Sequence, residues 1–134
     1  MSTIDWDKLI TPEQKAAKAK ADLIAYAAQK RYEREVGGMD WMLGEETVSV
    51  HTDRESQAKI IAERLAIAEG RRQDPDGWKF ADGVFRMVSN DDFVTLSDAV
   101  REHVRQCFGL EAQVLAGIEN GDITSEAEID AAFS

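Results

Sequence analysis

His103, Cys107 and Glu111 are the residues whose types and spacing come closest to a chemical site. Their spacing of i, i+4 and i+8 places them on one side of a helix, where an imidazole nitrogen and a thiolate are ligands that suit zinc. A zinc site needs about three or four ligands, and His51 is the only other histidine, so carboxylates would have to complete the shell. This shortage favours the alternative, in which Cys107 is a small buried hydrophobe and His103 flanks the core.

The sequence evidence for other kinds of catalytic site is weaker than that for a zinc site. A Cys107–His103 nucleophile pair would project from the middle of one amphipathic helix, whereas nucleophiles usually lie on loops around a pocket. The acidic residues at 53 and 55 and at 91 and 92 fall where helix N-termini favour negative charge. No Walker, dinucleotide-binding, nucleophile-elbow or His-Glu-x-x-His motif occurs. We therefore expect no catalytic residue, cofactor or metal; a small metal-dependent hydrolase using His103 and Cys107 is the enzymatic alternative.

The elements that must position these residues begin with a long helix. Thr11 and Gln14 form a capping box around Pro12, a residue favoured at the first helical position. The pattern predicts a helix to about Val36, ended by Gly37-Gly38. Its first half is mostly Ala, Lys and Gln, with little apolar surface to hold it on a core.

Two β-hairpins are predicted downstream. Residues 39–50 alternate about Gly44-Glu45, and residues 78–88 flank Asp82-Gly83, a dipeptide typical of two-residue type I′ turns.

Three further helices follow from capping and periodicity. Thr52-Asp53 caps a helix whose apolar stripe is expected to face the core, namely Ala58, Ile61, Leu65 and Ala68, widened by Ile60. Ser89 caps a long periodic helix that ends at Asn120-Gly121, and Thr124 or Ser125 caps a last one over about 126–133.

Together these elements predict an α+β fold. A small antiparallel sheet of two hairpins packs against two amphipathic helices, preceded by an N-terminal arm and a long Ala-rich helix. We expect residues 1–29 to form the arm and a helical attachment element, and residues 30–134 to form one compact domain.

Composition narrows the function classes. The net charge of −10 disfavours nucleic acid as a partner, because a phosphate backbone is bound by a basic face. No run approaches the ~18 apolar residues of a membrane span, and the first nine residues lack the apolar core of a signal peptide. The single cysteine excludes an internal disulfide. We expect a protein of the cytoplasm or of a particle assembled there.

Surface patterns suggest partners. The aromatic residues Trp41, Trp78, Phe80 and Phe85 fall on the hairpins, where a core role is favoured over a binding groove. The first helix is basic and the C-terminal stretch is acidic, an asymmetry that would pair neighbouring subunits head to tail if it is not simply a solvated face.

The opening segment is the expected contact element. Its apolar residues, with one from the following helix, are the predicted partner-binding set: Ile4, Trp6, Leu9, Ile10 and Leu23. Because exposed apolar side chains are unfavourable in water, we expect self-association or another partner.

Four segments resemble, in order and spacing, a domain of unknown function encoded by tailed bacteriophages and prophages, found in tail and tail-fibre gene clusters. They are residues 30–38, 52–58, 78–83 and 99–108 with Glu111, within a resemblance over about 30–133. Residues 4–11 also resemble the opening of phage tail-associated proteins. The resemblance implies a non-enzymatic virion protein, assembled in the host cytoplasm, that contacts other tail or fibre proteins and forms a homo-oligomer, with a trimer expected. A tail-fibre assembly chaperone acting in the host cytoplasm is the alternative.

Overall fold

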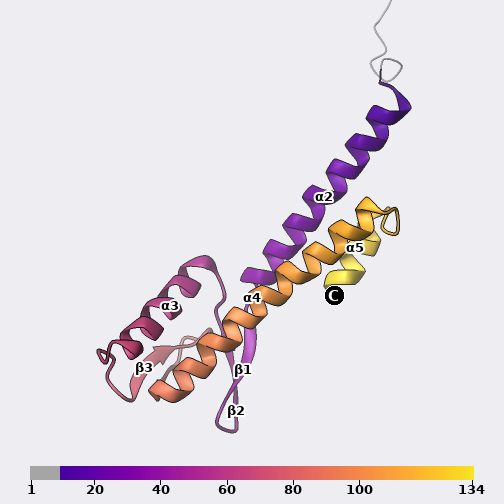
Figure 1. Cartoon of the computed structure of the whole chain (residues 1–134). Helices are drawn as coiled ribbons and strands as arrows, with labels where there is room; N and C mark the ends of the chain where they lie inside the picture. Colours follow the sequence, from indigo (N-terminus) through magenta and orange to yellow (C-terminus); the bar gives the residue numbers. More distant parts are fainter. Residues whose placement is uncertain (1–9) are drawn as a thin grey trace, which may run out of the picture. The chain divides into compact units, whose positions relative to one another are not determined.

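The structure is a computed structural model that describes residues 10–134 (Figure 1). Within that range the chain forms four helices and two separate two-stranded antiparallel sheets, which confirms the predicted α+β class. The elements are α2 (Pro12–Val36), β1 (Met39–Leu43), β2 (Glu46–Val50), α3 (Arg54–Ala68), β3 (Asp76–Lys79), β4 (Phe85–Val88), α4 (Asn90–Glu119) and α5 (Glu126–Phe133). Of the predicted partner-binding residues, Ile4, Trp6 and Leu9 lie outside the described residues.

The chain divides into two compact units. One contains the described part of residues 1–31 together with residues 109–134, and the other contains residues 32–108. Each has its own apolar cluster. Independent folding of residues 30–134 without residues 1–29 stays a prediction.

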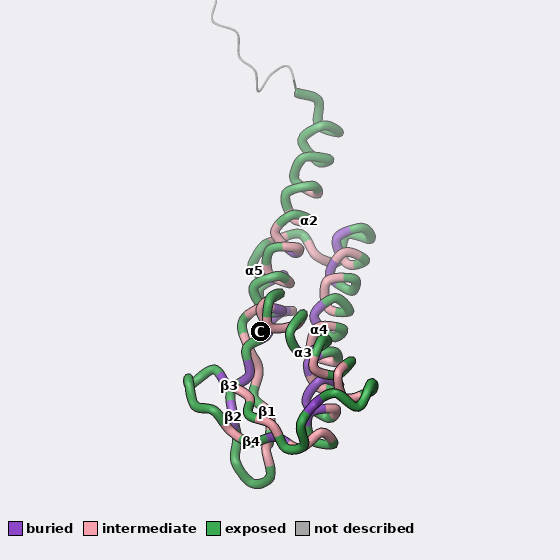
Figure 2. Tube along the Cα trace, turned by 90° about the vertical axis from the view of Figure 1, so that its left-hand side faces the viewer, coloured by how far each residue is buried: buried purple, intermediate pink, exposed green. Residues whose placement is uncertain are grey.

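Helix α2 begins and ends where the sequence predicts. The Thr11 N–H donates to Gln14 Oε1 at 2.9 Å and the Gln14 N–H donates to Thr11 Oγ1 at 3.1 Å, which completes the capping box. Residues 12–19 are exposed throughout, and burial starts only in the second half of the helix (Figure 2). Residues 12–19 therefore have no core to pack on within the described chain.

The β1–β2 hairpin also matches the prediction. Trp41 pairs with Val48 and Leu43 pairs with Glu46, which leaves Gly44 and Glu45 as the turn. Gly44 has a φ of +64°, a conformation that glycine adopts without a Cβ clash.

The β3–β4 connection differs from the predicted type I′ turn. That turn needs positive φ at both central residues, but only Gly83 has one, and the connection spans residues 80–84. Phe80 follows β3, which ends at Lys79, and is 1% exposed in the core. The Phe80 N–H still donates to the Val84 carbonyl at 3.1 Å.

The prediction that the α3 stripe of Ala58, Ile61, Leu65 and Ala68 faces the core is wrong, because these residues are exposed. Asp53 is the N-cap as expected, and its pKa is lowered because the Ser56 hydroxyl and backbone N–H donate to the carboxylate. Ile60 is buried and Ile67 packs on the core, whereas Ile61 and Leu65 are exposed. The apolar residues of α3 lie on two sides, and the stripe from Ala58 to Ala68 is the outer one.

The core of residues 32–108 is built from both hairpins and two helices. Phe93, Leu96 and Val100 of α4 pack with Ile60 of α3 and with residues of the strands and their connections, namely Val48, Val50, Phe80 and Val88. The Trp78 ring lies edge-on to the Phe93 ring, with centroids 5.0 Å apart. In the other unit, Val114 and Ile118 of α4 pack with Ala27 of α2 and with Ile129 and Phe133 of α5.

Candidate functional site

The three residues considered as zinc ligands, His103, Cys107 and Glu111, are engaged in structural contacts. His103 Nε2 lies 3.1 Å from the Arg34 carbonyl oxygen and 3.2 Å from that of Glu35, near the C-terminal end of α2. Cys107 is buried, with its Sγ 4.0 Å from the same His103 nitrogen. Glu111 accepts from Arg31 Nε at 3.0 Å. In residues 10–134 no three His, Cys, Asp or Glu side chains come together as a group that could hold a metal ion.

A buried polar cluster surrounds the end of α2. The Glu35 carboxylate is 1% exposed and accepts from Arg54 and from Gln57 Nε2, the latter at 3.0 Å. Thr52, which is fully buried, donates its hydroxyl to the Glu35 carbonyl at 2.6 Å and accepts from the Gly38 N–H at 2.9 Å. His103 completes the cluster through its contact with the same carbonyl. These bonds hold α2, the β2–α3 connection and α4 together.

Three of the four segments that carried the resemblance meet in this cluster. Glu35 comes from residues 30–38, Thr52 from residues 52–58, and His103 from residues 99–108. Every buried side-chain nitrogen and oxygen of the described residues has a hydrogen-bond partner. The shared residues therefore act here as determinants of the fold.

Arg72 is a second buried polar centre, and no sequence motif points to it. Its side chain is 1% exposed and donates to the Val88 carbonyl at 3.0 Å, Asn90 Oδ1 at 2.7 Å and Glu63 Oε2 at 3.1 Å. Its guanidinium also lies 4.8 Å from the centroid of the Phe93 ring. A buried arginine in a loop has no sequence period that would reveal it.

The basic run on α2 finds acidic partners in its own chain. Lys20 pairs with Glu119 at 2.5 Å and Lys30 pairs with Asp130 at 3.4 Å. Tyr26 donates to Asp130 at 2.6 Å, which lowers the pKa of that carboxyl and raises the pKa of the phenol. Two acidic residues of the C-terminal stretch, Glu119 and Asp130, are thus paired with the basic helix within one chain.

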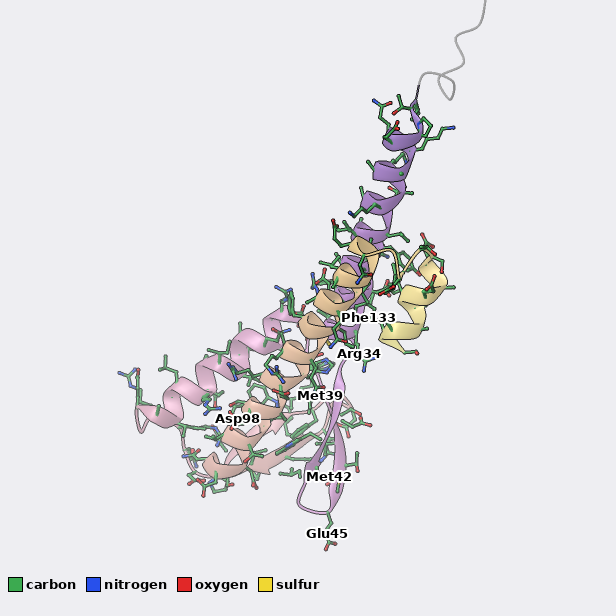
Figure 3. The ribbon with its side chains drawn as sticks, turned by 45° about the vertical axis from the view of Figure 1, so that its right-hand side comes forward. Arg34, Met39, Met42, Glu45, Asp98 and Phe133 are labelled. Carbon is green, nitrogen blue, oxygen red and sulfur yellow. The ribbon has the colours of Figure 1, made fainter. Side chains whose placement is uncertain are left out.

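A groove of about 790 Å³ lies between α3 and α4. Its apolar lining comes from both helices: Ile60, Ile61, Leu65, Ala68, Val100 and Val104. Ile61 is 69% exposed and Leu65 is 57% exposed. Arg64 and Arg101 lie at the groove with Asp98, which Figure 3 labels on α4. Arg64 pairs with Asp98 and donates to Ser97 Oγ at 2.6 Å, so one wall is held in place.

A second apolar surface is the outer face of the β3–β4 hairpin. Phe85 is 68% exposed and Met87 is 61% exposed. Both flank Gly77, at which a Cβ would lie about 4 Å from each side chain. Phe80, Trp41 and Trp78 are core residues as favoured, whereas Phe85 is not.

The two described members of the predicted partner-binding set differ in exposure. Ile10 is exposed, as an attachment residue requires. Leu23 is half-buried against the cluster of α2, α4 and α5, so much of its surface is already covered by its own chain.

A family comparison matches residues 18–133, which is most of the chain, to a domain of unknown function, DUF4376. The chain belongs to the DUF4376 family. No curated protein and no solved structure matches the chain. The description of DUF4376 names no activity, so the functional argument for this member depends on its own residues.

In the described residues of this DUF4376 chain, the buried polar side chains are hydrogen-bonded, whereas large apolar side chains such as Ile61, Leu65 and Phe85 are exposed. Among its described helices none has the length and apolar character needed to span a bilayer. The exposed outer stripe of α3 was visible in the sequence as Ile61 and Leu65, but its direction was not.

Proposed function

We propose that this chain is a non-enzymatic structural protein of a tailed bacteriophage, associated with the tail or tail fibre, that attaches to its neighbours through its N-terminal arm and α2. The observation that carries the proposal is the uncovered start of α2. Residues 12–19 are all exposed, although helices in proteins gain most of their stability from packing on other elements. A partner surface along this stretch would supply the missing packing.

The polar chemistry of the described chain supports a non-enzymatic role. The side chains best suited to chemistry are taken up by structural bonds, since His103 faces two backbone carbonyls and Cys107 is buried beneath it. The resemblance of four segments to a phage tail-cluster domain supplies the biological setting of the proposal.

The test is mass spectrometry of purified particles of the phage or induced prophage that encodes the chain. We expect its peptides in washed particles at a constant ratio to a known tail protein. A replication protein from the same lysate is the control for carry-over. Absence from the particles would refute the virion role.

The assembly-chaperone alternative is favoured by one observation, the exposed apolar groove between α3 and α4, because such surfaces bind unfinished partners transiently. It predicts association with a fibre protein in the infected cell and absence from mature particles. The hydrolase alternative predicts a stoichiometric metal in purified protein, which elemental analysis measures directly.

A further inference from the structure

We propose that the groove between α3 and α4 binds residues 4–10 of a second copy of this chain. The inference rests on the proposed function only in taking the N-terminal arm as the attachment element, and it names the surface that receives the arm.

The groove has the dimensions and lining of a binding site. Its volume of about 790 Å³ falls within the roughly 300–1,000 Å³ of sites that bury a ligand. Its apolar walls include Ile61 and Leu65, which are more than half exposed and have no role in the core. Because these two residues lie one helical turn apart, they form one contiguous apolar patch.

The charges at the groove select an acidic occupant. Two arginines and one aspartate line it, so it carries a net positive charge on a chain whose net charge is −10. Arg64 is paired with Asp98, whereas Arg101 forms no ion pair with a carboxylate of residues 10–134. An occupant with carboxylates beside apolar side chains would satisfy both features of the lining.

Residues 4–10 have this chemistry. Ile4 and Trp6 alternate with Asp5 and Asp7, and Lys8, Leu9 and Ile10 follow, so the segment keeps a net negative charge. In an extended bound segment, alternate side chains point to opposite sides, so Ile4 and Trp6 would enter the groove while Asp5 and Asp7 face its basic rim. Tryptophan supplies the large buried area that anchors small interfaces.

The proposed attachment role of the arm favours a second copy as the source of the segment. An arm with apolar side chains and a groove with exposed apolar walls on every chain give two copies complementary surfaces. The contact joins two different surfaces, so it is heterologous and generates a closed ring, such as the expected trimer, or an open chain.

The experiment compares the full chain with two variants, Trp6→Asp in the arm and Leu65→Asp in the groove, by sedimentation equilibrium over a range of micromolar concentrations. Met87→Asp is the matched control, because Met87 is as exposed as Leu65 but lies outside the groove. We expect wild type and the control to associate alike and each test variant to weaken association at least tenfold. Circular dichroism checks that all four chains fold.

Mixing the two test variants gives the decisive readout. The Trp6→Asp chain keeps its groove and the Leu65→Asp chain keeps its arm, so the mixture should regain one heterologous contact and form a one-to-one complex. Failure of the mixture to associate, or a monomeric wild type, would overturn the inference. Loss of association in the Met87→Asp control would point to the hairpin face instead and also overturn it. None of these outcomes changes whether the chain is present in virions.

Discussion

The carboxylate of Glu35 is bound by the guanidinium of Arg54, with Nε 2.5 Å from Oε2 and Nη2 2.9 Å from Oε1. Glu35 is 1% exposed whereas the Arg54 side chain is 57% exposed, so the pair places a buried negative charge beneath a cation that faces solvent. Two parallel N–H···O bonds fix the orientation of both groups. The relationship ties the last turn of α2 to the first residue of α3.

Replacing Glu35 with Ala should destabilise the chain by about 1.5–3 kcal/mol, because Arg54 and Gln57 lose a charged acceptor. Chemical denaturation of the full chain measures the change. Glu55→Ala is the control and should cost only about 0.5 kcal/mol, because Glu55 pairs with Lys59 on the solvent-facing side of α3. Equal effects of the two substitutions would contradict a role for the buried carboxylate.

Arg72→Ala should be more damaging, at about 3 kcal/mol or more. It leaves the Val88 carbonyl without a buried donor and removes the cation from the face of Phe93. Arg72→Lys should recover little, because an ammonium cannot span the same acceptors. The neighbouring Arg71, whose side chain is 77% exposed, provides the control. Similar melting temperatures for Arg71→Ala and Arg72→Ala would refute the assignment.

Replacing each of two glycines of α4 by alanine should change the stability of the chain in different ways. At Gly109 an added Cβ meets nothing within 4 Å, so Gly109→Ala should stabilise the helix by about 0.5–1 kcal/mol. At Gly117 the Cβ would lie 2.8 Å from Ile123 Cδ1, so the same gain should be lost to a clash. Denaturation midpoints of the two variants decide the matter, and a stabilising Gly117→Ala would show that Ile123 moves aside freely.

The pKa of the Asp82 carboxyl is lowered from 3.8 to about 2, mainly because the Arg86 side chain donates to it and also because the Val84 N–H does. Since the folded pKa lies below the ordinary value, the stabilising contribution is complete above pH 4. It is lost as the pH falls through 2. An NMR titration of the Asp82 carboxyl should show a midpoint near 2. In Arg86→Gln the midpoint should move back towards the ordinary value, and an unchanged midpoint there would contradict the cause.

Deleting residues 1–10 should leave the melting temperature of the dilute chain almost unchanged while abolishing self-association. The deletion keeps the Thr11 hydroxyl that caps α2 through the Gln14 N–H. Burial of Trp6 and Ile10 against a partner is worth about 1.5–3 kcal/mol for each side chain, and this is lost only in the assembly. Differential scanning calorimetry and light scattering measure the two effects. A sharp fall in the melting temperature would instead mean that the arm packs on its own chain.

The sequence alone determined those parts of the fold that depend on neighbouring residues. The capping box of Thr11 and Gln14, the Asp53 and Ser125 caps and the turn at Gly44 all formed as predicted. Each is a short-range effect, in which a side chain satisfies a nearby backbone group or a glycine takes a positive φ. The α+β class followed from these signals because they separate helices from hairpins.

Tertiary structure alone decided which surfaces face inward. Helix α3 carries apolar residues on two sides, so periodicity could not tell that Ile60 enters the core while Ile61 and Leu65 line a groove. The burial of Arg72 and the engagement of His103 by α2 carbonyls depend on segments far apart in the chain. Side-chain pattern fixes what a helix could bury, but only the packing of distant elements selects the face that is buried and the face that stays exposed.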